Sequence, residues 1–168
     1  SSRLMLHRSG LAAAVLAMPL VFDLAVKKLA QHTLDFGSPI AVFPGFNLTL
    51  LFNPGVSFGL FPVGSDTGLV FMLLVQSVLC LGIAIYAWMQ WDNVIVWPLL
   101  LLLSGALGNL VDRFLNGAVT DYLDFYIGAY HWPAFNLADV WITLGVAGLI
   151  AAEVFGRTPD KQTVKHKG

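Results

Sequence analysis

Apolar residues gather in four long runs along the chain, and shorter polar segments separate them. The runs cover about residues 10–29, 68–89, 94–114 and 137–155. Each run is close to the roughly 20 apolar residues that an α-helix needs to cross the hydrocarbon core of a bilayer. The pattern therefore predicts an all-α integral membrane protein with four transmembrane helices. We expect one membrane domain over residues 1–168.

The composition agrees with that prediction and excludes several classes of protein. The chain is 57% hydrophobic and only 11% charged, whereas an average soluble domain is about 45–50% apolar and about 25% charged. The formal net charge is -1, so no basic field attracts a polyanion. We therefore expect membrane lipid as a partner and no binding of nucleic acid.

Lysine and arginine predict the orientation of the helices in the membrane. Six of the nine basic residues lie in the two tails and three lie on the opposite side. Because cytoplasmic segments carry the excess of basic residues, both termini are expected in the cytoplasm, including the tail 156–168. The first apolar run follows Arg3 and Arg8 like a signal peptide. It lacks a convincing cleavage site, so we interpret it as a retained helix.

Two segments then face outward, residues 30–67 and 115–136. Within the first, the stretch Phe46–Phe52 partly alternates between apolar and polar residues. This alternation predicts a strand, and with it a small extracytoplasmic β-containing region lying on the membrane. The second outer segment is interpreted as a loop whose aromatic residues lie at the level of the lipid headgroups.

Polar side chains at the outer helix ends and in the outer loops are the candidates for function, because ionisable groups at membrane depth are costly. They form one layer at one depth in the predicted topology. The layer contains Asp23, Lys27, Asn53, Asn109, Asp112, Arg113, Asp121, Asp124, Asn136 and Asp139.

Two groups in this layer each allow a structural and a functional interpretation. Asp23 and Lys27 have the spacing of a helical ion pair, which either anchors the helix end or packs against the outer loop and shapes a site. Asn109, Asp112 and Arg113 either end the third helix at the interface or belong to a site. In the second case Asp112 braces Arg113, which reaches a lipid phosphate or loop carbonyls.

The start of the fourth helix has the same ambiguity. Asn136 followed by Asp139 resembles a capping box, and a carboxylate in a first helical turn also suits a general base. If the second outer loop folds back, Asp121 or Asp124 approaches Asp139. Two neighbouring carboxyl groups share a proton, which is the chemistry of aspartic proteases. The spacing does not choose between Asp121 and Asp124.

The sequence does not contain the residue groups that a cysteine nucleophile or a metal site requires. Cys80 has no partnered histidine, and the four histidines are scattered, so we expect no metal site and no organic cofactor. The alternative function is a small proton- or ion-coupled membrane transporter, because buried acids also mark ion paths. A transporter needs polar groups at the midplane, whereas these residues cluster toward one face.

Five segments follow one another along the chain: Asp23-x-x-x-Lys27, Asn53-Pro-Gly-Val-Ser-Phe58, the run from Gly105 to Arg113, Thr120-Asp121-Tyr122, and Phe135-Asn-Leu-Ala-Asp139. Together they resemble the bacterial lipoprotein signal peptidases, also called signal peptidase II, a family of four-helix intramembrane aspartic peptidases. The resemblance covers nearly the whole chain. Ser104 and Tyr122 depart from the usual glycine and phenylalanine, which leaves fine substrate preference open.

The resemblance implies a function and assigns roles by position. The catalytic pair falls on Asp121 and Asp139, using a water to cleave a diacylglyceryl-modified prolipoprotein just N-terminal to the lipidated cysteine. The family also implies an inhibitor of the globomycin type. It places the protein in the bacterial inner membrane, with its site near the periplasmic face. Family positions that line or support the site match Asn53, Gly55, Asn109, Arg113, Asn136, Ala138, Asp23, Lys27 and Asp112.

Overall fold

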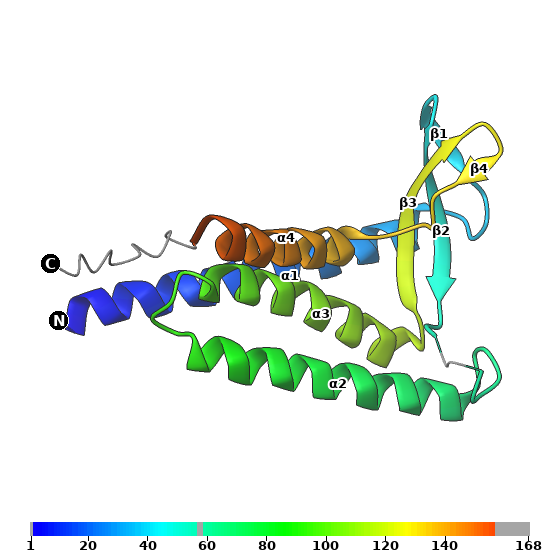
Figure 1. Ribbon diagram of the computed structural model, residues 1–168. Helices are drawn as coiled ribbons and strands as arrows, with labels where there is room; N and C mark the ends of the chain where they lie inside the picture. Colours follow the sequence, from blue (N-terminus) through cyan, green and yellow to red (C-terminus); the bar gives the residue numbers. More distant parts are fainter. Residues whose placement is uncertain (1, 57–58, 157–168) are drawn as a thin grey trace, which may run out of the picture.

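Four long helices run side by side, and a small sheet stands across one end of them (Figure 1). The computed structural model describes residues 2–56 and 59–156. The helices are α1 (Ser2–Thr33), α2 (Asp66–Met89), α3 (Val96–Asn116) and α4 (Leu137–Gly156). Each of them is long and apolar enough to cross a membrane. The predicted four-helix membrane architecture is confirmed.

The helix boundaries differ most from the prediction at α1. It begins at Ser2 rather than near residue 10 and continues to Thr33, because polar residues at both ends extend the helix beyond the apolar part that crosses the bilayer. The helix α3 ends at Asn116, and the next residue, Gly117, takes the left-handed conformation with φ of 75°. Of the tail predicted at 156–168, only Gly156 lies within the described residues.

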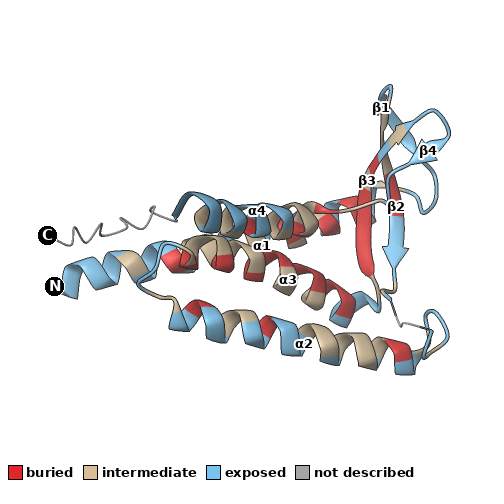
Figure 2. Cartoon of the chain, in the orientation of Figure 1, coloured by how far each residue is buried: buried red, intermediate tan, exposed pale blue. Residues whose placement is uncertain are grey.

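The helix α3 lies in the middle of the bundle and packs against the three other helices. It also carries much of the buried surface, as the colouring in Figure 2 shows. Small residues make this possible, since a Cβ atom added at Gly105 meets the Ala138 carbonyl of α4, and one added at Gly108 meets the Asp23 carboxylate of α1. The small residues of α3 therefore bring α1 and α4 close to it.

The sheet has four antiparallel strands in the order β1-β2-β3-β4. The strand predicted at Phe46–Phe52 is confirmed as β2 (Phe46–Asn53), paired with β1 (Ile40–Phe43). The interpretation of the second outer segment as a loop was wrong. It forms β3 (Val119–Ile127) and the short β4 (Tyr130–His131), because β3 gains its hydrogen bonds from the distant strand β2.

The far end of the bundle is apolar. Ala12 of α1, Ala87 of α2 and Leu99 of α3 belong to a buried cluster there, with Val96 and Leu100. One cation lies beside it: Arg8 donates to the Trp91 carbonyl at 2.6 and 3.1 Å, between α2 and α3. The polar residues singled out above lie at the opposite end, beneath the sheet.

Candidate active site

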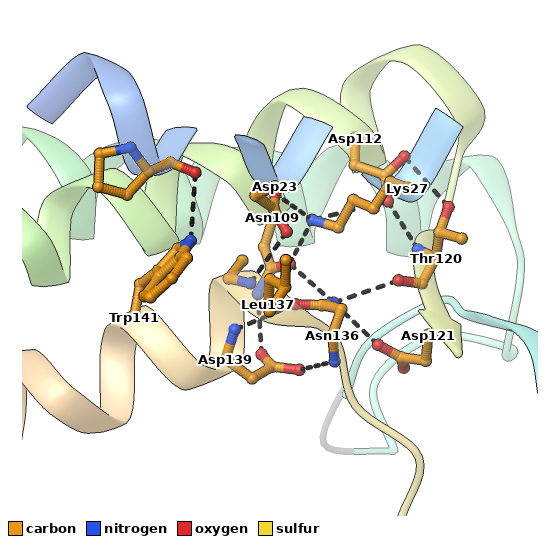
Figure 3. A network of polar contacts seen from close by, with 12 residues as sticks. Asp23, Lys27, Asn109, Asp112, Thr120, Asp121, Asn136, Leu137, Asp139 and Trp141 are labelled. Atoms are coloured by element: carbon orange, nitrogen blue, oxygen red, sulfur yellow. Dashed lines mark hydrogen bonds and ion pairs between the residues drawn. The ribbon is translucent and has the colours of Figure 1, made fainter. Parts of the chain in front are cut away.

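A connected set of polar side chains joins α1, α3, β3 and α4 beneath the sheet (Figure 3). Most of its members are almost completely buried: Asp23 and Asn136 are 0% exposed and Lys27 is 1% exposed, whereas Asp139 is half-buried. Buried polar groups are tolerated only where hydrogen bonds replace the lost water. The hydrogen bonds within this set therefore replace the water that its buried polar groups have lost.

The ion pair of α1 forms the back of the site. Lys27 Nζ lies 2.8 Å from Asp23 Oδ2 and also donates to Asn109 Oδ1 of α3 at 2.9 Å. Asp23 Oδ1 accepts the backbone N–H of Ala138 at 2.9 Å, in the first turn of α4. This pair is therefore not an exposed anchor of the helix end, because it joins three helices in the protein interior.

Asn136 connects the two acids that the resemblance selects. Its Nδ2 donates to Asp121 Oδ1 of β3 at 2.9 Å, while its backbone N–H donates to Asp139 Oδ2 of α4 at 3.1 Å. Asp139 Oδ1 accepts a hydrogen bond from Asn109 Nδ2 at 3.0 Å. The two carboxyl groups consequently lie on either side of one fully buried asparagine.

The capping box at the start of α4 is confirmed. Asn136 Oδ1 accepts the Asp139 N–H at 3.0 Å, and the Asp139 carboxylate accepts the Asn136 N–H in return. The same contacts orient the Asp139 carboxylate toward Asn109 and β3. Capping and a place in the site are thus not exclusive, because the cap itself holds the carboxylate in position.

Asp112 forms no ion pair with Arg113 among the described contacts, although its negative charge acts on the guanidinium. Its carboxylate accepts the Thr120 N–H at 2.6 Å and the Asn116 amide at 2.7 Å, and lies 4.0 Å from Lys27 Nζ. It therefore ties the start of β3 to the end of α3. Its role in the geometry is to hold the strand that carries Asp121.

Arg113 reaches the carbonyl of the last residue of β2, next to the outer loop. Its Nη2 donates to the Asn53 carbonyl at 3.3 Å, whereas its Nε is buried without a partner among the described residues. A Cβ added at Gly55, where φ is 91°, would lie 3.2 Å from Arg113 Nη2. Glycine is therefore required here for the loop to pass close to the guanidinium.

Burial raises the pKa of Asp121 to about 7, and the negative charge of Asp139 adds to that effect. Hydrogen bonds from Asn136 and Asn53 and the charge of Lys27 act in the opposite direction but do not cancel it. A carboxyl group with this pKa holds a proton near neutral pH. The site can thus present one protonated and one ionised carboxyl group.

Asp124 takes part in a different set of contacts. Its Oδ1 lies 2.7 Å from His131 Nδ1 of β4, and its Oδ2 accepts a hydrogen bond from Asn47 of β2 at 3.3 Å. Of the two acids that the spacing left open, the fold brings Asp121 to Asn136, while Asp124 joins three strands of the sheet. Among the described residues, no group of three or more histidine, cysteine or acidic side chains has the arrangement of a metal site.

Comparison with known proteins gives this arrangement a family. The sequence model described as signal peptidase (SPase) II matches residues 15–155. The chain belongs to that family. Two relatives named lipoprotein signal peptidase support the assignment. The one from Desulforapulum autotrophicum is 43% identical over 84% of this chain and 90% of its own length, and the one from Sulfurihydrogenibium sp. is 40% identical over 81% and 86%.

Solved structures agree with the fold of this signal peptidase II. Two of them, both described as a bacterial membrane enzyme, give TM-scores of 0.75 and 0.74 at 27% and 28% identity. The first covers 91% of this chain and 93% of that chain, and the second covers 86% and 93%. The protein is therefore a multi-pass membrane protease of the signal peptidase II family.

Three residues that contact this polar cluster had no assigned role in the sequence. Thr120 accepts a hydrogen bond from Gln31 at 2.7 Å in addition to its contacts with Asp112. The Tyr122 hydroxyl accepts the Leu137 N–H at 3.2 Å, and burial raises the pKa of that hydroxyl. Thr120 and Tyr122 flank Asp121 in the sequence, so their position was the available signal. Gln31 carried none, because its partner lies 89 residues away.

Proposed function

We propose that the protein is a membrane-embedded aspartic endopeptidase that removes signal peptides from diacylglyceryl-modified prolipoproteins. Asp121 and Asp139 are the catalytic pair, and the cut falls N-terminal to the lipidated cysteine. The observation that supports the pair is the position of Asn136, which hydrogen-bonds both carboxyl groups. The name carried by the relatives, lipoprotein signal peptidase, supports the class of substrate.

The proposed mechanism uses one proton that the pair shares. A water molecule lies between the carboxyl groups, and the ionised one takes a proton from it as the water oxygen attacks the scissile carbonyl carbon. The protonated one donates to the carbonyl oxygen as the tetrahedral intermediate forms. When the carbon–nitrogen bond breaks, the carboxyl group that took the water proton gives it to the leaving amine, and the other accepts a hydroxyl proton from the intermediate, which restores the starting pair. The pair titrates as a unit, so neither residue is assigned a fixed role.

The neighbouring amides and the arginine have supporting roles in this proposal. Asn136 holds Asp121, and Asn109 holds Asp139, which keeps both carboxyl groups in a fixed orientation. The side chain of Asn53 also lies within hydrogen-bonding reach of Asp121, so it is placed to hold substrate backbone or a developing oxyanion. Arg113, whose buried Nε has no partner among residues 2–56 and 59–156, binds a loop or lipid oxygen.

The position of the site suits a substrate that arrives within the membrane. The polar cluster lies where the helices meet the sheet, so a peptide bond leaving the hydrocarbon region meets water and the carboxyl groups together. We place this end at the periplasmic face of the inner membrane and both termini in the cytoplasm, as the basic residues predict. A globomycin-type inhibitor is expected to compete at the same site.

The transporter alternative is less well supported by the arrangement of charges. A transporter exposes its site alternately to both sides of the membrane, near the bilayer midplane. Here the buried acids Asp23, Asp112 and Asp121 and the half-buried Asp139 gather at the sheet end, while the opposite end of the bundle is the apolar cluster. Such an arrangement favours a site that opens on one side.

The decisive experiment incubates the purified protein with a lipidated prolipoprotein and measures cleavage. We expect Asp121→Asn and Asp139→Asn each to lower kcat by about 10³-fold or more, because each removes one proton-transfer group. Asp92→Asn, an exposed acid at the far end of the bundle, is the matched control and should keep the wild-type rate. Wild-type cleavage by either dyad variant would refute the pair. So would loss of cleavage in a folded Asp124→Asn protein whose Asp121→Asn counterpart stays active.

A further inference from the structure

A groove of about 440 Å³ lies between α1 and α3, on the same end of the bundle as the sheet. Its part nearer the bundle centre is apolar and is lined by Val21 and Leu24 of α1. Toward the sheet the lining becomes polar, with Lys28 and Gln31 of α1 and Asn116 of α3. The groove thus changes from apolar to polar along the direction in which a membrane changes from hydrocarbon to headgroup.

The polar part of the groove offers hydrogen-bond donors that the protein does not use up. Gln31 spends one N–H on the Thr120 hydroxyl, and Asn116 spends one on the Asp112 carboxylate. Each side-chain amide has two N–H groups, so each retains one. Lys28 is exposed, and its ammonium forms no ion pair with an acid of the described residues. These three side chains place a free cation beside two free amide donors.

The other charges along the groove are already compensated. Lys27 is held by Asp23 and Asn109, and Asp112 is held by Thr120 and Asn116. Both are buried, at 1% and 2% exposure. The charge that the groove presents to an incoming ligand is therefore the positive charge of Lys28. This charge complements an anion, and the apolar part beneath it complements an acyl chain.

A second hollow of about 540 Å³ continues the groove toward the sheet. It shares Gln31 and Asn116 with the groove and is also lined by Phe52 of β2 and by Gly117. The polar donors thus lie between an apolar channel and additional space near the strands. A ligand that occupied both would place its anionic group at the donors, with an apolar part on one side and a small polar part on the other.

We propose that this groove binds one phospholipid with an anionic headgroup from the leaflet at the sheet end of the helices. The phosphodiester accepts from Lys28, Gln31 and Asn116, and an acyl chain lies along Val21 and Leu24. A phosphodiester without a balancing cation, as in phosphatidylglycerol, matches the single unpaired positive charge. The proposal stands on the groove and its donors, and it does not depend on the proposed peptidase function.

The bound lipid also has a path to the candidate active site. Gln31 and Asn116 contact Thr120 and Asp112, which hold the start of β3. Asp121 is the next residue along that strand. A phosphate on these amides would fix their orientation and thereby restrict the position of the strand. We therefore expect the lipid to act as a positioning ligand and to stabilise the sheet end of the protein.

The test measures lipids retained by the purified full chain in native mass spectrometry after exchange into mild detergent. The probes are phosphatidylglycerol, phosphatidylcholine and diacylglycerol with identical acyl chains, so only the headgroup differs. We expect one phosphatidylglycerol per protein, retained at least fivefold over the other two. Lys28→Gln should abolish this preference, and Lys28→Arg should keep it. Arg3→Gln, which removes an exposed cation from the other end of α1, should also keep it.

Three outcomes would overturn the proposal. One is retention of diacylglycerol equal to that of phosphatidylglycerol, which would show a neutral-lipid groove. Another is a Lys28→Gln protein that still prefers phosphatidylglycerol as the wild type does. The third is an Arg3→Gln protein that loses this preference as fully as Lys28→Gln is expected to lose it. Leu24→Trp provides an independent check, because an indole in the apolar part should displace all three lipids without changing the charge. Thermal unfolding of each variant shows that it is folded.

Discussion

The two ends of the helix bundle are held together by different physical means. At the end away from the sheet, Ala12, Ala87 and Leu99 pack in an apolar cluster. At the sheet end, a network of directional contacts around Lys27 and Asn136 joins α1, α3, α4 and β3. Helices in a membrane gain no hydrophobic effect from meeting one another, so each end must rely on close packing or on polar contacts.

This difference separates the part of the protein that sets helix geometry from the part that sets chemistry. Packing contacts are numerous and individually weak, so the apolar end tolerates changes that preserve volume. A buried hydrogen-bond network depends on every member, because a group that loses its partner remains in a medium of low dielectric constant. The sheet end should therefore be the more sensitive of the two to single substitutions.

The largest stability effect is expected at the ion pair of α1. Lys27→Met removes the cation between Asp23 and Asp112 and leaves two buried acids without their compensating charge. Loss of one partner of a buried pair costs about 3–5 kcal/mol. The measurement is the free energy of unfolding in detergent that contains no phospholipid. Lys28→Met is the control, because Lys28 is the neighbouring lysine and its side chain is exposed. Equal stability of the two variants would show that the network does not hold this end together.

The next effect tests the packing of α4 on α3. A Cβ atom at Gly145 would lie 2.8 Å from the Leu102 backbone nitrogen and 2.8 Å from the Pro98 carbonyl oxygen. Because both are backbone atoms, Gly145→Ala must separate the helices, at a cost of about 2 kcal/mol. Gly82→Ala is the matched control, since nothing lies within 4 Å of its added Cβ. It should be neutral or slightly stabilising in the same unfolding measurement.

The pH dependence of cleavage sharpens the comparison at the proposed catalytic pair. With the pKa of Asp121 at about 7, its proton is present below that pH and is lost above it. We expect kcat/KM to fall about tenfold per pH unit above 7, because a pair with both groups ionised cannot donate a proton. The substrate used must not titrate in this range. A rate that is constant to pH 9 would contradict the shared proton.

The raised pKa of Asp121 also makes the stability of the folded protein depend on pH. The dependence is opposite in sign to that of an acid whose pKa is lowered by a paired cation. Between the usual carboxyl pKa of about 3.9 and about 7, the folded protein keeps a proton on Asp121 that the unfolded chain has lost. Stability should therefore be highest below this window and fall as the pH rises through it. In Asp121→Asn this dependence should disappear, which a series of unfolding curves at different pH values checks.

The smallest effect is expected at Arg8, the cation beside the apolar cluster. Arg8→Gln removes two hydrogen bonds to the Trp91 carbonyl and the cation–π contact with the Trp97 ring, whose centroid lies 5.2 Å from the guanidinium carbon. The partly exposed site limits the loss to about 1 kcal/mol. Arg3→Gln, on the exposed start of the same helix, should cause no change. A loss as large as that of Lys27→Met would remove the distinction between the two ends.

The parts of the fold that depend on local pattern were predictable. Four apolar runs predicted four helices, and the alternation at Phe46–Phe52 predicted β2. The capping box at Asn136 and Asp139 was also predictable, because its two residues contact each other within one turn. The strand β3 was not, since its two acids interrupt the alternation and its hydrogen bonds come from a strand more than 60 residues earlier.

The candidate site was predictable as a set of residues and not as a set of contacts. The cost of ionisable groups in a membrane selected Asp23, Lys27 and Asp112 from the sequence alone. Their partners depended on how α3 packs, so the sequence could not show that the Asp112 carboxylate accepts hydrogen bonds from Thr120 and Asn116. Residues that are adjacent in a helix point in different directions, so Asp112 meets Thr120 while Arg113 meets the Asn53 carbonyl.

The sequence by itself determined the membrane class, the number of helices and the concentration of polar residues toward one end. These follow from composition and period, which are local properties of the chain. Only the tertiary structure decided that Asp121, and not Asp124, meets Asn136 beside Asp139. That choice depends on the pairing of β3 with β2 and on the close approach of α1 and α4 to α3. Both are contacts between distant segments, whose geometry is set by packing.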